Sequence, residues 1–134
     1  VTGVQTCALP ILLVPADGVE GVKNAVLEIV KHAGPNPCPP IVLGIGIGGT
    51  MDQAAVMSKK ALLRDISVPH KDADYAKLEE EIMEMVNKTG IGPQLGGTTT
   101  CIGVNIEWGA THIAGLPVAV TIMCHAARHA HVVL

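Results

Sequence analysis

The ten residues Ile41-Val-Leu-Gly-Ile-Gly-Ile-Gly-Gly-Thr50 decide the fold of this 134-residue chain. The first seven are apolar or glycine, as in a strand buried on both faces, and the next two glycines permit a tight turn. Thr50 with Gln53 three positions later is a capping-box signature, which predicts a helix from Thr50 to about Arg64. A strand, a tight turn and a helix form a βα unit, so the sequence predicts the α/β class.

The rest of the chain continues this alternation. Apolar residues at helical spacing predict two further helices, over residues 17–33 and 75–88. β-branched and apolar runs predict two further strands, over residues 98–107 and 117–124. Glycine and proline in residues 91–97 predict a loop between the last helix and the next strand. We therefore expect a mixed, layered α/β fragment.

The composition describes a globular chain and excludes several kinds of partner. Hydrophobic residues make up 49% of the chain and charged residues 16%, which is enough apolar surface to exclude intrinsic disorder. The net charge is -3 and the basic residues are scattered, so we expect no nucleic-acid partner. The apolar runs fall short of the roughly 20 residues that span a bilayer, so we expect no membrane helix.

The first eleven residues, Val-Thr-Gly-Val-Gln-Thr-Cys-Ala-Leu-Pro-Ile, show neither helical nor strand periodicity and no basic segment of a signal peptide. They resemble the translated read-through of a sequencing-library adapter. We therefore expect residues 1–11 to be non-native and residues 12–134 to be the C-terminal part of a larger domain whose upstream half is missing. The alternative is an ordinary N-terminal strand.

The cysteines favour thiol chemistry over disulfides. Cys7 lies in the adapter-like segment, and the remaining odd set without a signal peptide indicates the reducing cytoplasm. No Cys-x-x-Cys pair is present to support a zinc knuckle. Cys38 stands in Pro-Cys-Pro-Pro, where the prolines remove amide donors and stiffen the loop. A rigid, exposed thiolate suits an iron–sulfur cluster, and an inert buried thiol is the alternative.

A glycine pattern suggests a second possible chemistry. Gly44, Gly46 and Gly49 match Gly-x-Gly-x-x-Gly, which in a nucleotide-binding oxidoreductase holds a pyrophosphate at the start of a helix. That fingerprint also needs an acidic residue on a second strand about 20 positions further on. Asp65 instead follows a predicted helix, so the sequence favours glycines that serve a tight turn and close helix packing.

Histidines give two further candidates. His125, His129 and His131 lie together near the end of the chain, where they are either metal ligands or solvated surface residues. The pair His125 and His129 lacks the glutamate of a zincin motif. His112, in Ala-Thr-His before an apolar strand, is either satisfied structurally or orients a substrate carboxylate.

Short motifs spread over residues 12–134 occur in one order. They are Leu13-Val-Pro-Ala-Asp-Gly, Cys38-Pro-Pro-Ile-Val-Leu-Gly-Ile-Gly-Ile-Gly-Gly-Thr, Lys59-Lys-Ala-Leu-Leu-Arg64, Leu78-Glu-Glu-Glu, Gly90-Ile-Gly-Pro-Gln, Thr111-His-Ile-Ala-Gly-Leu-Pro-Val-Ala-Val and Cys124-His-Ala-Ala-Arg-His. Together they resemble the α part of class I, iron–sulfur-dependent fumarate hydratases and L(+)-tartrate dehydratases.

The resemblance implies a hydro-lyase that reversibly hydrates a small dicarboxylate, with fumarate/malate preferred and L-tartrate as the alternative. It implies a [4Fe-4S] cluster on three cysteines, with one iron open to the substrate as a Lewis acid. Cys38 and Cys124 match the second and third cluster ligands, and the first belongs to an upstream Cys-Gln-Asp-Thr-Gly motif that is absent here. His112 matches a catalytic histidine that contacts the substrate, whereas Cys101 matches no ligand.

The resemblance also implies partners. The general base and most substrate-clamping arginines and lysines belong to a β subunit or domain, so the fragment alone is expected to be inactive and the enzyme to be a hetero- or homo-oligomer. Two alternatives stay open: a nucleotide-binding oxidoreductase that uses the Gly44–Gly49 turn, and a non-catalytic interaction subunit. A separation of Cys38 and Cys124 beyond the reach of one cluster would favour the interaction subunit.

Overall fold

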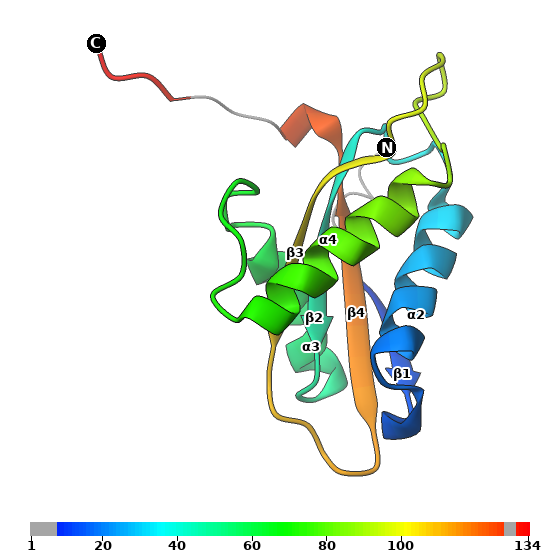
Figure 1. Cartoon of the computed structure of the whole chain (residues 1–134), viewed down its shortest axis with the longest axis vertical. Coiled ribbons are helices and arrows are strands. Elements are labelled where there is room, and N and C mark those ends of the chain that lie inside the picture. Colours follow the sequence, from blue (N-terminus) through cyan, green and yellow to red (C-terminus); the bar gives the residue numbers. More distant parts are fainter. Residues whose placement is uncertain (1–7, 128–130) are drawn as a thin grey trace.

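A four-stranded sheet with helices on both faces forms the centre of the computed structural model, which describes residues 8–127 and 131–134 (Figure 1). The strand order is β1-β4-β2-β3. β2 pairs with β3 in parallel, and β4 runs antiparallel to both β1 and β2. The strands are β1 (Ala8–Leu13), β2 (Ile41–Ile47), β3 (Cys101–Trp108) and β4 (Leu116–Met123). The prediction of a mixed α/β fragment is confirmed.

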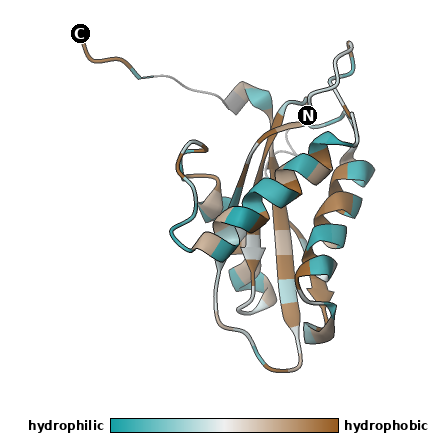
Figure 2. Ribbon diagram, viewed as in Figure 1, coloured by the Kyte–Doolittle hydropathy of each residue, from teal (hydrophilic) through white to brown (hydrophobic). Residues whose placement is uncertain are grey.

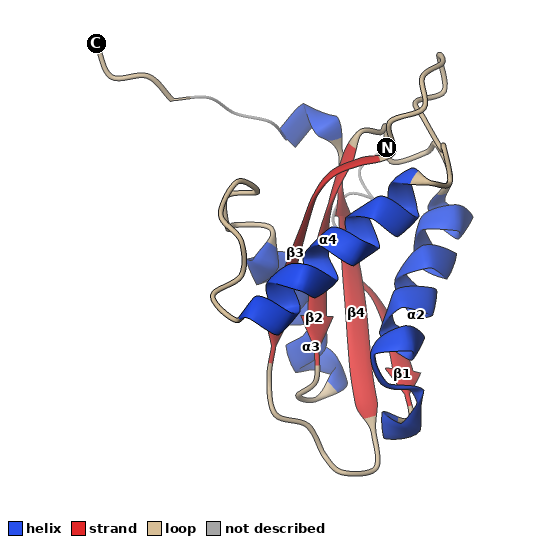
Figure 3. Cartoon of the chain, viewed as in Figure 1, coloured by secondary structure: helices blue, strands red, loops and turns tan. Residues whose placement is uncertain are grey.

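The three α-helices of the described residues cover the sheet (Figure 3). Figure 1 shows α2 and α4 on one face of the sheet and α3 on the other. Two short 3-10 turns complete the structure: η1 follows β1, and η2 follows β4. The bounds are α2 (Gly18–Ala33), α3 (Met51–Ala61), α4 (Ala73–Asn87), η1 (Pro15–Asp17) and η2 (His125–Ala127).

The main core lies between the sheet and the pair α2 and α4. Hydrophobic residues of the strands face the apolar sides of these helices, whose outer sides are hydrophilic (Figure 2). The largest fully buried side chains of this core are Val26, Val30, Ile41, Leu43, Ile45, Ile82, Val86, Ile106, Val118, Val120 and Ile122. With no phenylalanine in the sequence, aliphatic side chains fill the core, as the composition predicts.

On its opposite face, β2 carries glycines in place of side chains. This lets α3 pack very close to the strand. A Cβ atom added to Gly46 would lie 2.0 Å from the carbonyl oxygen of Ala54, and one added to Gly44 would lie 2.1 Å from that of Ser58. The helix backbone therefore rests directly on the strand backbone. The prediction that these glycines serve close helix packing is confirmed.

α3 ends at Ala61, three residues before the predicted end at Arg64. The amides of Leu62 and Arg64 bond to carbonyls three residues back, so the last turn tightens and stops. The side-chain amide of Asn105 on β3 donates to the carbonyls of both Ala61 and Arg64, at 3.0 and 2.8 Å. A residue far along the chain thus caps this helix.

The predicted strand over 98–107 begins later, at Cys101. The side chain of Asn87, at the end of α4, accepts the amides of Thr100 and Cys101 and donates to the Cys101 carbonyl. The Asn87 side chain thus binds the backbone groups of Thr100 and Cys101 where the strand begins. Since β3 is an edge strand, a helix side chain here also covers polar groups that would otherwise stay unpaired.

β1 includes residues 8–11 of the segment that resembles adapter read-through. Ala8–Leu13 pairs with Leu116–Thr121 of β4 in an unbroken antiparallel register. Pro10 is compatible with this strand because β1 is an edge of the sheet. Residues 8–11 therefore contribute a strand, whereas residues 1–7 lie outside the described part of the chain.

A buried ion pair ties α4 to the segment that follows α3. The guanidinium of Arg64 bonds to Glu79, a carboxylate that is 7% exposed, and to the side-chain oxygen of Asn105 at 3.1 Å. Glu79 also accepts the amide of Ile106 on β3 at 2.8 Å. One carboxylate thus joins α4, β3 and the segment after α3.

We expect Glu79→Ala to destabilise the fold by about 2–3 kcal/mol, because it leaves a largely buried guanidinium and a strand amide without their partner. The free energy of unfolding in urea measures this loss. The neighbouring Glu80→Ala is the matched control, since Glu80 is exposed on the same helix and should change stability by less than about 0.5 kcal/mol. Equal effects of the two substitutions would contradict a stabilising role for the pair.

Candidate functional site

The sheet register brings Cys38 and Cys124 to one end of the molecule. Cys38 stands three residues before β2, and Cys124 directly follows β4. Because the two strands are antiparallel, with Val42 paired to Met123, the start of β2 lies beside the end of β4. Two cysteines that are distant in sequence therefore meet at the same end of the sheet.

The two cysteines are neighbours at this end of the sheet. Cys124 is buried and Cys38 is half-buried. Burial raises the pKa of the Cys38 thiol, and the neighbouring Cys124 thiol raises that pKa further.

Cys38 has an uncommon backbone conformation. Its φ of 56° lies in the left-handed region, and among the described residues it is the one non-glycine residue with positive φ. That region costs an L-residue about 1–2 kcal/mol. The Cys38 amide donates to the carbonyl of Pro35 at 3.2 Å, which closes a tight turn. Strained backbone of this kind concentrates at functional sites.

The turn η2 reaches back to both cysteines. The ring Nδ1 of His125 lies 2.9 Å from the carbonyl oxygen of Cys38 and 3.8 Å from the Cys124 sulfur. The amide of Ala126 donates to the same sulfur at 3.4 Å. The sequence predicts His125 only as a metal ligand or a solvated residue, and it does not predict this contact, although the position of His125 next to Cys124 is a usable signal.

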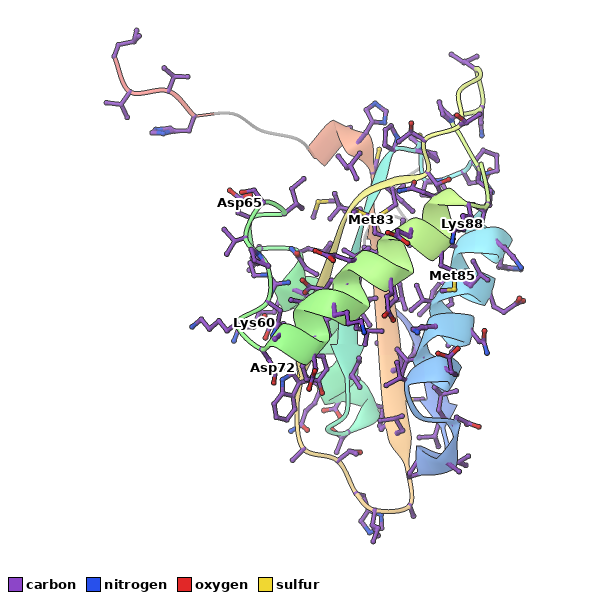
Figure 4. All side chains as sticks on the ribbon, in the orientation of Figure 1. Lys60, Asp65, Asp72, Met83, Met85 and Lys88 are labelled. Carbon is purple, nitrogen blue, oxygen red and sulfur yellow. The ribbon has the colours of Figure 1, made fainter. Side chains whose placement is uncertain are left out.

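A pocket of about 380 Å³ opens beside Cys124 and His125. Its wall is mainly apolar, with Arg64 and Asp65 as the charged residues, and Asp65 lies in the loop after α3 at the side of the sheet (Figure 4). The apolar lining is Val42, Leu62, Leu63, Ile66, Ile102 and Met123. The volume suits a small molecule.

The third described cysteine does not join the pair. Cys101 is buried in the core between the sheet and the helices, and its thiol donates to the carbonyl of Gly103 at 3.1 Å. Burial raises the pKa of Cys101 to about 11. No group of three or more histidine, cysteine or acidic side chains with metal-binding geometry occurs in residues 8–127 and 131–134. The described residues therefore offer two thiol ligands.

The other predicted histidines lie elsewhere. His131 is exposed, and His129 falls outside the described residues. His112 lies in the loop between β3 and β4, at the opposite end of the sheet from the cysteines (Figure 1). The 8 residues of β4 that separate the two ends span about 25 Å. The structure thus brings Cys38 and Cys124 together but does not bring His112 to them.

The loop of His112 is nevertheless well defined. The Nδ1 atom of His112 accepts the amide of Ala114 at 3.1 Å, so the neutral ring carries its proton on Nε2. The hydroxyl of Thr111 bonds to the carbonyls of Gly49 and Gly115 at 3.3 and 2.9 Å. This loop therefore packs against the glycine-rich turn after β2.

The glycine-rich turn has no free amides in the positions that would face a pyrophosphate. The amide of Gly48 donates to the carbonyl of Pro117 at 2.8 Å, and that of Gly49 to Ala110 at 3.1 Å. The amide of Thr50 donates to the side chain of Gln53 at 3.0 Å. Since the chain itself satisfies these donors, the turn favours the structural interpretation over nucleotide binding.

Within the described residues, no helix is both long and apolar enough to cross a membrane.

Known proteins resemble this chain along most of its length. The family described as Fumarate hydratase (Fumerase) matches residues 2–133. A protein of Methanocaldococcus jannaschii with the provisional name L(+)-tartrate dehydratase subunit alpha is 52% identical over 120 residues, which cover 89% of this chain and 42% of that protein. The L(+)-tartrate dehydratase subunit alpha of Escherichia coli K12 is 41% identical over 126 residues, covering 91% of this chain and 42% of that subunit. The chain thus spans under half the length of these relatives, and it belongs to the fumarate hydratase (Fumerase) family.

Proposed function

We propose that this chain supplies Cys38 and Cys124 as two ligands of a [4Fe-4S] cluster in a hydro-lyase that acts on a small dicarboxylate. The observation that carries the proposal is the antiparallel pairing of β2 with β4, which brings Cys38 and Cys124 to the same end of the sheet, where His125 contacts both residues. Thiolates are the usual ligands of such clusters. A third ligand has to come from outside the described residues.

The surroundings of the thiols fit this role. The Ala126 amide donates to the Cys124 sulfur, a kind of bond that stabilises a metal-bound thiolate. The half-buried position of Cys38 leaves one side of the pair accessible. A bound cluster would supply a Lewis-acidic iron that polarises the hydroxyl or carboxylate oxygens of the substrate. The largely apolar pocket beside Cys124 would limit the water around these groups.

The names of the relatives support a choice of substrate and partner. The two relatives described above carry the name of an L(+)-tartrate dehydratase α subunit, whereas the family carries the name fumarate hydratase. We propose a four-carbon dicarboxylate, with L-tartrate and fumarate/malate as the two substrates to compare. An α subunit implies a β subunit, which we propose supplies the general base, and we place the enzyme in the cytoplasm.

We propose His112 as a substrate contact on the condition that it reaches the cysteine pair from a second chain. Within one chain, the length of β4 holds its loop about 25 Å from the cysteine pair, far beyond the size of a dicarboxylate. Only a second chain could bring a His112 loop to this pair. The exposed position of the loop is compatible with such a contact.

The test is anaerobic reconstitution of the α polypeptide that contains this sequence, together with its β partner. We expect L-tartrate dehydration or fumarate hydration that requires added iron and sulfide and falls to background after iron is chelated. The chain of 134 residues alone should be inactive and serves as the control. Full dicarboxylate turnover after removal of iron would contradict the proposal.

A further inference from the structure

The turn after β4 holds the cysteine pair through one histidine. The Nδ1 atom of His125 lies 2.9 Å from the carbonyl oxygen of Cys38. A carbonyl oxygen only accepts hydrogen bonds, so Nδ1 carries the proton and donates it. His125 itself directly follows Cys124 in the chain. His125 therefore links the backbone of one cysteine to the chain segment of the other.

The conformation of Cys38 needs such a link. Its backbone lies in the left-handed region, and prolines on both sides provide no amide donors to hold the loop. The Cys38 amide bonds only locally, to Pro35. The bond from His125 to the Cys38 carbonyl instead comes from a segment 87 positions away. It therefore fixes the Cys38 loop relative to the end of β4.

We propose that His125 is a positioning residue whose Nδ1–H donor locks the Cys38 loop against Cys124, so that the two thiols converge. The purpose of this convergence rests on the proposed function, but the geometry does not depend on iron. The ring contributes through its donor at Nδ1, and its Nε2 atom is not required. This distinction makes the proposal testable with side chains that resemble different parts of histidine.

The test is thiol cross-linking of the iron-free 134-residue chain with dibromobimane, which bridges two neighbouring thiols. Combined cleavage at lysine, arginine and glutamate separates Cys38, in peptide 32–59, from Cys124, in peptide 108–128, and leaves Cys101 in another peptide. Mass spectrometry then measures the rate at which the Cys38–Cys124 bridge forms. We expect His125→Ala to slow it about fivefold, the factor that corresponds to one net hydrogen bond of about 1 kcal/mol.

Two isosteric variants separate positioning from a general structural effect. His125→Asn places an amide donor near the position of Nδ1 and should restore most of the bridging rate. His125→Gln places its amide near the position of Nε2 and should behave like His125→Ala. His32→Ala, which removes an exposed histidine from the end of α2, should bridge at the wild-type rate. Thermal unfolding of every variant identifies any that fails to fold.

Bridging at the wild-type rate in His125→Ala would overturn the proposal, and so would equal rates for the folded Asn and Gln variants. Because the assay contains no iron, its outcome is independent of the proposed cluster. Normal bridging in the wild type, combined with failure of the reconstituted protein to bind iron, would contradict the proposed function and leave the role of His125 intact.

Discussion

Replacing either Cys38 or Cys124 with serine should abolish iron–sulfur binding by the reconstituted α polypeptide. The two cysteines lie at the same end of the sheet, so each would hold a neighbouring iron, and a serine hydroxyl is a harder and less acidic ligand than a thiol. The visible absorbance of the cluster, with the iron and sulfide content per polypeptide, measures the loss. We expect both values to fall to the background of unreconstituted protein.

Cys101→Ala is the matched control for these substitutions. Cys101 is buried in the core, and its thiol bonds to a backbone carbonyl instead of facing the pair. Alanine removes this thiol without burying a new hydroxyl, so iron content should stay at the wild-type value. Full iron content in either serine variant would show that the pair does not hold the cluster.

Gly46→Ala should destabilise the fold by at least about 4 kcal/mol, a large part of the stability of a domain of this size. The added Cβ would lie 2.0 Å from the carbonyl oxygen of Ala54 and 2.8 Å from the amide nitrogen of Ser58. Both are backbone atoms of α3, so no side-chain rotation relieves the contact. The helix must move away from β2, and urea unfolding measures the cost.

Gly109→Ala tests whether this effect comes from packing or from the loss of any glycine. A Cβ at Gly109 would meet only the flexible side chain of Met57, at 3.5 Å, and the φ of Gly109 lies outside the left-handed region. We expect a change within about 0.5 kcal/mol. A similar loss of stability in both variants would contradict the close approach of α3 to β2.

Local patterns predicted most of the secondary structure. The run from Ile41 to Thr50 contains a strand, a turn and a capping signature, and each is a short-range signal. The end of α3 was predicted three residues too late because Asn105, on a distant strand, caps it. Likewise, Asn87 fixes the start of β3 from another element. Such boundaries depend on tertiary contacts, which periodicity does not contain.

The candidate site, too, could be predicted only in part from the sequence, because its geometry depends on long-range contacts. Family resemblance selected Cys38 and Cys124, and no spacing in the sequence could have shown that their thiols meet. Their contact follows from the antiparallel pairing of β2 with β4, a long-range property of the sheet. The same pairing places His112 at the other end, which twelve residues of separation from Cys124 did not reveal. The bond from His125 also depends on this register.

The glycine-rich turn shows why one motif supports two interpretations. The spacing Gly44, Gly46 and Gly49 is compatible with both a phosphate loop and close helix packing. What distinguishes them is whether the turn amides are free, and here the chain uses them internally. Whether these amides are occupied depends on Pro117 and Ala110, which lie 69 and 61 positions further along the chain than the glycines they accept from.

The pairing of β2 with β4 also fixes when the site can form during folding. The bond between His125 and Cys38 closes a loop of 87 positions, which costs about 4 kcal/mol of chain entropy in addition to a constant. β4 is the last described strand along the chain, and the two cysteines meet only once it has paired with β2. Contacts of such long range form slowly. Iron loading at this pair would therefore follow this pairing and would report that β2 and β4 have come together.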